Sequence, residues 1–327
     1  MKKYFIVIGI IFLGSQLIFA QKKASKSNKA KTEESPISLE LENSVFWEIS
    51  GNGLKAPSYL FGTHHLYPAS NIKKNDLIKE KINACQVVVG EIAMDNMLAM
   101  SMATMKVMLM KDTTLKDLLG EKDYERVDTY MKKNMGMSVA FFNNMRPMVL
   151  TQMITASKAS KDLGIDEKTS PKTAEIGDFS NTLDLYFQEY GKSQNKEIKG
   201  LETIEQQANI LFNSYSLKRQ AEMLLEAIED DKGSNSMENV KKLNEFYKQQ
   251  NLNELAKLSL NENMMKKEEY NTLLKNRNDA WIPKIIDLIH QKPAFIAVGA
   301  LHLAGEDGII YQLRKKGYQV KPVKIEL

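Results

Sequence analysis

Short apolar runs that end at turn residues lie near both ends of this 327-residue chain, and the stretch between them has helical periodicity. Strands are expected at 45–49, 58–61, 86–92, 294–298 and 318–325. Helices are expected at 115–135, 201–230, 237–258 and 268–290. The sequence therefore predicts an α/β protein with a central mixed sheet built from N- and C-terminal segments and a large helical insertion at about 94–290.

Residues 1–20 have the order of a secretory signal peptide. Two lysines precede an apolar run at 4–19, and Ala20 ends it. A membrane anchor is the alternative, but a spanning helix takes about 20 apolar residues and this run is shorter. Residues 21–44 are rich in Lys, Ser and Glu and are expected to form a disordered linker. We therefore expect an exported protein, periplasmic or extracellular, with one domain at 45–327 and no integral membrane segment after signal removal.

The charge of the chain argues against nucleic acid as a partner. The formal net charge is +4, and two of the lysines lie in the segment expected to be removed. No block of Lys and Arg alternates with aromatic residues, whereas duplex binding depends on a concentrated positive surface.

Three of the four histidines fall in two similar loops. One reads Gly-Thr-His-His at 62–65 and the other reads Gly-Ala-Leu-His at 299–302, each after a short apolar run. Glycine leaving a strand permits a sharp turn. A histidine three residues later would lie above the carboxyl end of the strand, where open α/β sheets bind ligands. We therefore place His65 and His302 in one candidate site, with structural histidines as the alternative.

The third candidate is Glu91, which ends the valine-rich run at 87–90. An acid there is costly to bury unless it is paired or binds a cation. Two imidazoles and one carboxylate form a ligand set for zinc or, with more oxygen ligands, for manganese or cobalt. A structural ion pair with Arg277 or a lysine is the alternative for Glu91.

These features resemble the TraB/PrgY/GumN proteins, which are similar to the Tiki metalloproteases. The resemblance extends over about residues 45 to 325. Its motifs are Phe61-Gly62-Thr63-His64-His65, Glu91, Gly200-Leu201-Glu202-Thr203, Arg277-Asn278 before Trp281, Val298-Gly299-Ala300-Leu301-His302, and the ending at 305–320.

The resemblance implies the erythromycin-esterase-like fold, in which two histidines and a glutamate line one pocket. Tiki members are metal-dependent proteases, which would make His65, Glu91 and His302 both catalytic residues and metal ligands. Esterase relatives instead use the histidine as a general base on water without a metal. PrgY-like members act by restraining a peptide pheromone.

Four further residues are expected to support the site or to contact substrate. Glu202, Arg277 and Asn278 lie in the motifs that carry the resemblance, and a structural Glu202–Arg277 pair is the alternative to catalysis. His64 either supports the site or is merely exposed.

Together the motifs predict an exported, metal-assisted and peptidase-like hydrolase that acts on a peptide or small acyl substrate. The expected cofactor is divalent zinc, manganese or cobalt. A non-catalytic protein that binds or sequesters peptides and a metal-free esterase with a histidine base are the alternatives.

Seven methionines crowd the segment at 94–110. Their spacing predicts a pliable core helix, because methionine fills irregular gaps. An adaptable wall for a peptide and a Cu(I) site are the alternatives.

Overall fold

The computed structural model describes residues 39–327 except 65–66, 95–96, 163–181, 230–233 and 261–264. The expected signal peptide and most of the expected linker lie outside the described residues. The described chain forms two compact units. The sheet unit comprises the described residues of 39–95, 180–203 and 242–327, and the helical unit comprises those of 96–179 and 204–241.

The sheet unit is built on one mixed six-stranded sheet with the order β4-β3-β5-β2-β1-β6. Its strands are β1 (Phe46–Ser50), β2 (Ser58–Thr63), β3 (Val87–Gly90), β4 (Glu197–Gly200), β5 (Ala294–Gly299) and β6 (Gln319–Pro322). Neighbours from β4 to β2 are parallel, whereas β1 is antiparallel to both β2 and β6. The α/β class and the mixed sheet with strands from both ends of the chain are confirmed.

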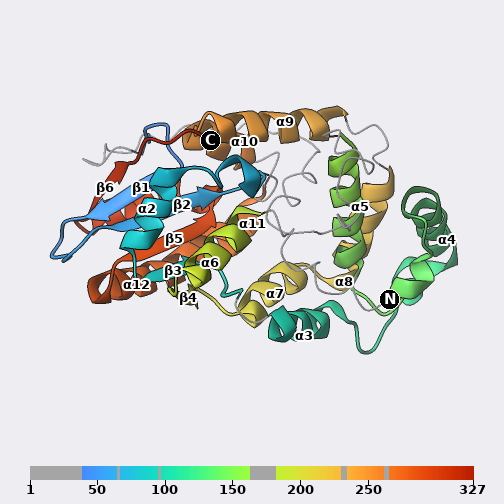
Figure 1. The fold of residues 1–327 in the computed structure, drawn as a ribbon. Helices are drawn as coiled ribbons and strands as arrows, with labels where there is room; N and C mark the ends of the chain where they lie inside the picture. Colours follow the sequence, from blue (N-terminus) through green and yellow to red (C-terminus); the bar gives the residue numbers. More distant parts are fainter. Residues whose placement is uncertain (1–38, 65–66, 95–96, 163–181, 230–233, 261–264) are drawn as a thin grey trace. The chain divides into compact units, whose positions relative to one another are not determined.

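Helices α2 and α6 lie in front of this sheet in Figure 1. Phe187 of α6 packs against Phe61 of β2 and Phe295 of β5, with ring centroids 4.8 and 5.0 Å apart. These contacts bury the apolar face of the sheet. The helical elements of the unit are η2 (Ala69–Asn71), α2 (Asp76–Ala84), α6 (Leu183–Ser193), α10 (Leu252–Ser259), α11 (Lys267–Tyr270), η5 (Asn271–Lys275), α12 (Asn276–Gln291), η6 (Ala300–His302) and α13 (Ile309–Lys315).

The helical unit contains α3 (Met97–Met108), α4 (Leu115–Met135), η3 (Val139–Phe142), α5 (Pro147–Asp162), α7 (Ile204–Asn213) and α8 (Leu217–Glu229), and α9 (Ser234–Lys248) contains residues of both units. Helix α4 begins at the Thr114 capping box and has the predicted bounds. On the methionine-rich α3, Met100 and Met108 are buried, as in a core helix, whereas Met102 is 66% exposed.

Several features within 94–290 differ from the sequence expectation. Strand β4 was not predicted, because its four residues, Glu-Ile-Lys-Gly, are all exposed or half-buried and lack an apolar pattern. The helix expected at 201–230 is two helices, α7 and α8, and the helix expected at 237–258 is also two, α9 and α10. The helix expected at 268–290 contains the π-helical turn η5 between α11 and α12.

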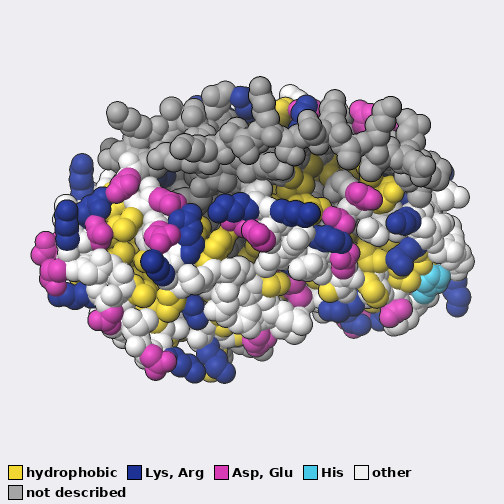
Figure 2. Space-filling view, turned by 180° about the vertical axis from the view of Figure 1, so that it is seen from behind, with side chains coloured by type: hydrophobic (Ala, Val, Ile, Leu, Met, Phe, Trp, Pro, Cys, Tyr) yellow, Lys and Arg dark blue, Asp and Glu magenta, His cyan; other side chains and the backbone are white. Residues whose placement is uncertain are grey.

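Among the described residues, no helix is both long and apolar enough to cross a bilayer. On the face drawn in Figure 2, Lys and Arg side chains are interspersed with Asp and Glu side chains.

Candidate functional site

The parallel strands β2, β5, β3 and β4 bring the predicted residues to one edge of the sheet, the one formed by the carboxyl ends of these strands. Thr63 at the end of β2 is in register with Gly299 at the end of β5. Gly90 at the end of β3 is in register with Gly200 at the end of β4. Because parallel strands end at the same edge, the residues that follow them share one site.

Glu91 follows β3 at this edge, and its side chain is 7% exposed. Its Oε1 accepts a hydrogen bond from the backbone N–H of Gly299 at 2.9 Å. Its Oε2 accepts one from Nη2 of Arg277 at 2.5 Å. A Cβ at position 299 would lie 3.2 Å from Oε1 of Glu91, so glycine there allows the backbone to approach the carboxylate.

Glu202 lies beside Glu91, because the ladder between β3 and β4 continues past both strands. The N–H of Glu202 donates to the carbonyl of Glu91 at 2.9 Å. The carboxylate of Glu202 meets Arg277 through two bonds, Oε1 to Nη2 at 2.6 Å and Oε2 to Nε at 3.2 Å. The predicted Glu202–Arg277 pair is therefore present.

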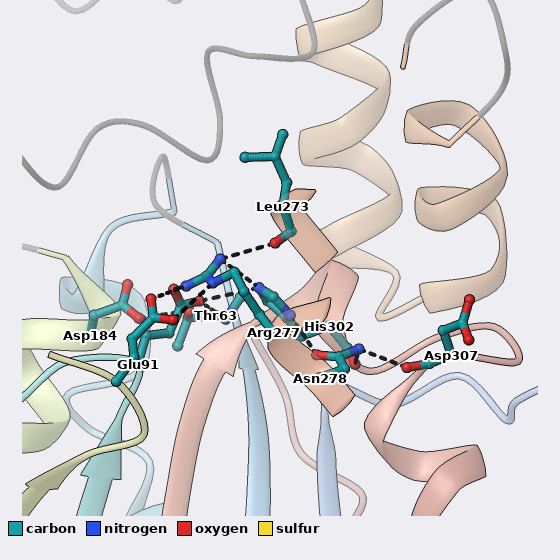
Figure 3. Close-up of polar contacts among 10 residues, drawn as sticks. Thr63, Glu91, Asp184, Leu273, Arg277, Asn278, His302 and Asp307 are labelled. Carbon is teal, nitrogen blue, oxygen red and sulfur yellow. Dashed lines mark hydrogen bonds and ion pairs between the residues drawn. The ribbon is translucent and has the colours of Figure 1, made fainter. Parts of the chain in front are cut away.

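Arg277 is the centre of this network (Figure 3) and is 3% exposed. Besides its bonds to the two glutamates, Nη1 donates to the carbonyl of Leu273 and to Nε2 of His302, both at 3.1 Å. These contacts use all five N–H donors of the guanidinium. Arg277 therefore organises the site and has no donor left for a substrate anion.

The electrostatics of the pairing keep Arg277 charged. Burial lowers its pKa, but the charges of Glu91 and Glu202 and the hydrogen bonds to them outweigh burial, so the pKa is raised above its ordinary value. Two buried carboxylates share one guanidinium, which leaves the three groups with a net charge of about −1 when both acids are ionised. Such a cluster attracts a further cation.

His302 lies at the end of the 3₁₀ turn η6 and is 1% exposed. Its Nδ1 lies 2.7 Å from Oδ1 of Asn278. Nδ2 of Asn278 donates to the carbonyls of His302 and Asp307 at 3.1 and 2.8 Å, so the amide oxygen must face the ring. An amide oxygen only accepts, so Nδ1 of His302 carries a proton. Its Nε2 accepts from Arg277, so the ring is the neutral Nδ1–H tautomer.

Trp281 covers both the histidine and the arginine. Its ring centroid is 4.5 Å from that of His302 and 4.5 Å from the guanidinium carbon of Arg277. Trp281 is one turn after Arg277 on α12 and is 1% exposed. The indole therefore shields the network from water and adds a cation–π contact.

A second polar group lies where β2 ends. Thr63 donates to Oδ1 of Asp184, at the start of α6, at 2.8 Å, and both side chains are buried. Tyr247 donates to the carbonyl of Gly62 at 2.7 Å, and burial raises its pKa well above the ordinary value. Sequence reasoning did not single out Asp184 or Tyr247, because neither lies in a motif and both reach the site from helices distant in sequence.

Five of the seven predicted site residues lie together. Glu91, Glu202, Arg277, Asn278 and His302 form one contiguous network. His64 is half-buried, with its ring centroid 5.1 Å from that of Tyr247. His65 lies outside the described residues.

Two of the three predicted metal ligands face each other. Nε2 of His302 is 3.8 Å from Oε1 of Glu91. Within the described part of the chain, no group of three His, Cys, Asp or Glu residues is arranged to hold a metal ion.

Comparison with known proteins gave one family. The model of the TraB/PrgY/gumN family matches residues 45–322, which include every residue of the network. No curated protein and no solved structure matched the chain.

Proposed function

Since this chain belongs to the TraB/PrgY/gumN family, we propose that it is an exported hydrolase that cleaves a peptide or small acyl bond with the help of a divalent metal. The observation that carries the proposal is the buried pairing of a fixed imidazole with a carboxylate. Nε2 of His302 lies 3.8 Å from Oε1 of Glu91, and the proton on Nδ1 is held by Asn278.

The chemistry of the donors fits such an ion. An imidazole nitrogen and a carboxylate oxygen are ligands for zinc, manganese and cobalt. Protein ligands of this kind usually donate the second ring N–H to an oxygen, as His302 does to Asn278. The net negative charge of the Glu91–Arg277–Glu202 group also favours a cation. His302 and Glu91 would hold the ion, with His65 as the third ligand.

A divalent ion bound there supplies polarisation of a carbonyl and activation of water near neutral pH. The residues of the chain supply orientation and proton transfer. Gly299 and Arg277 fix the carboxylate of Glu91, which can accept a proton from a water at the sheet edge. Trp281 excludes solvent from the face of the His302 ring, which strengthens every charge interaction within the site.

Export is supported by the N-terminal segment alone. Its lysines, apolar run and Ala20 have the order of a signal peptide. A periplasmic or extracellular location would place the site where exported peptides are available as substrates.

A second candidate is a metal-free esterase with His302 as the base. The fixed Nδ1–H tautomer favours it, because a general base also needs an unprotonated Nε2. The two candidates differ in whether the site holds a metal at all.

The test is the metal content of the purified mature protein, measured by mass spectrometry for wild type, His302→Ala and Glu91→Gln. His290→Ala is the matched control, because the exposed His290 bonds only Tyr318 among its described contacts. Near-stoichiometric metal that is lost in the first two variants and kept in the control supports the proposal.

A wild-type protein that is empty and fails to bind added zinc, manganese or cobalt overturns the metal-assisted reaction. Turnover of acyl esters by that protein would then favour the histidine-base esterase. Peptide binding without new termini in the mass spectrum would favour a sequestering protein.

A further inference from the structure

Arg277 donates to both described residues that a metal would need. Its Nη1 donates to Nε2 of His302 at 3.1 Å, and its Nη2 donates to Oε2 of Glu91 at 2.5 Å. The unprotonated Nε2 of His302 has one lone pair, which cannot accept a hydrogen bond and bind a cation at the same time, whereas each oxygen of Glu91 has two. A divalent ion must therefore displace the Nη1 bond of Arg277 before it can bind His302, and its positive charge opposes that of the guanidinium at Glu91.

The remaining partners of Arg277 are sufficient to hold it after displacement. Glu202 binds the guanidinium through two oxygens, at 2.6 and 3.2 Å, which is the strongest geometry for an arginine–carboxylate pair. The carbonyl of Leu273 and the ring of Trp281 add a third bond and a cation–π contact. Three of the five donors thus keep their partners without His302 or Glu91.

The local backbone matches this role. Arg277 follows the π-helical turn η5, and its Nη1 donates to the carbonyl of Leu273 within that turn. Such turns are rare and occur often at functional sites, because they widen a helix where a side chain needs room. The turn thus gives the guanidinium an anchor on its own helix, independent of the sheet edge.

We propose that Arg277 is a resident cation that competes with the divalent metal for His302 and Glu91, and that Glu202 retains the guanidinium when the metal enters. The inference rests on the proposed function, and it adds a regulation of the same site. In the metal-free protein Arg277 neutralises part of the buried negative charge. In the loaded protein the ion takes over that task.

The test is zinc affinity, measured from the fluorescence of Trp281, which contacts both Arg277 and the ring of His302. The chain has two tryptophans, so the Trp47→Phe background leaves Trp281 as the sole reporter. Arg277→Met removes the competitor and should tighten zinc binding at least about tenfold. Glu202→Gln removes the carboxylate that retains Arg277 and should weaken binding at least about tenfold.

Charge alone would also move these two variants in opposite directions, so Arg277→Lys separates the explanations. Lysine keeps the charge but lacks the planar fork that reaches both ligands. Competition therefore predicts tighter zinc binding than in wild type, whereas charge alone predicts no change. Circular dichroism with EDTA and with zinc checks that each variant is folded.

Zinc binding by wild type that becomes tighter in both arginine variants supports the inference. If wild type binds zinc and both arginine variants bind it equally tightly or more weakly, the competition is overturned and the proposed function stands. Failure of wild type and of both variants to bind zinc, manganese or cobalt overturns both proposals.

Discussion

Asn278 accepts the Nδ1 proton of His302 at 2.7 Å and at the same time donates to the backbone carbonyl of that residue at 3.1 Å. A single amide thus fixes both the position and the tautomer of the ring. Whether His302 binds a metal or acts as a base, Nε2 must be unprotonated, and Asn278 is the residue that makes it so. Asn278 is a positioning residue, because it acts through His302.

We expect Asn278→Ala to lower turnover about 10- to 100-fold, the usual cost of removing a partner that orients a histidine ligand. Without the amide, the neutral ring can adopt the other tautomer and can rotate. Long-range ¹H–¹⁵N spectra should show a change in the His302 tautomer, which a purely structural effect would not produce.

Tyr318→Phe is the control for this variant. It removes a comparable contact, 2.7 Å from the Tyr318 hydroxyl to Nε2 of His290, away from the sheet edge. Turnover should be unchanged in Tyr318→Phe. Full activity and an unaltered His302 spectrum in Asn278→Ala would show that Asn278 has no positioning role.

We expect Arg277→Met to destabilise the metal-free protein by about 3–5 kcal/mol, because it leaves two buried carboxylates without their counter-charge. Urea denaturation in EDTA measures the change in the free energy of unfolding. Arg126→Met is the matched control, since Arg126 forms exposed pairs with Asp123 and Glu229 that should matter little. Equal effects of the two variants would contradict the assignment of Arg277 as the centre of the network.

The strands of the sheet could be predicted to the extent that they are apolar. Strands β2 and β5 are almost wholly buried, so their sequences are continuous apolar runs between turn residues. Strand β4 is polar, and only its pairing with β3 makes it a strand. Its place in the sheet depends on contacts between residues more than 100 positions apart, which no local pattern contains.

The candidate site could be predicted where it follows from strand ends. Glu91 and His302 come after parallel strands, so their shared edge follows from the α/β class. The pairs of Arg277 with Glu91 and Glu202 were alternatives in the sequence, but its contact with His302 could not be predicted, because it depends on how α12 packs beside η6. Asp184 was missed because a helix distant in sequence brings it to Thr63.

We expect Gly299→Ala to abolish most activity without unfolding the protein. The new Cβ would lie 3.2 Å from Oε1 of Glu91 and 3.6 Å from Cδ2 of His302, so it presses on the carboxylate. Gly62→Ala is the comparison, because its Cβ would meet the backbone of Ala300 at 3.1 Å and should instead lower the melting temperature. Normal turnover in Gly299→Ala would show that the position of Glu91 is not critical.

Cys85, the only cysteine, should make the stability of the sheet unit fall at alkaline pH. Burial raises the pKa of its thiol from 9.0 to about 12. Between these values the unfolded chain loses the thiol proton and the folded chain keeps it, so the unfolded state is favoured as the pH rises. The contribution of Cys85 is therefore fully present below pH 9 and is lost toward pH 12.

Comparison of wild type with Cys85→Ala isolates this effect, because other groups with raised pKa values, such as Tyr247, are present in both proteins. The difference between their free energies of unfolding should shrink as the pH rises from 9. The buried thiol should also react slowly with an alkylating reagent at pH 8 until the protein unfolds. A constant difference across this range, or rapid alkylation of the native protein, would mean that Cys85 is accessible to solvent.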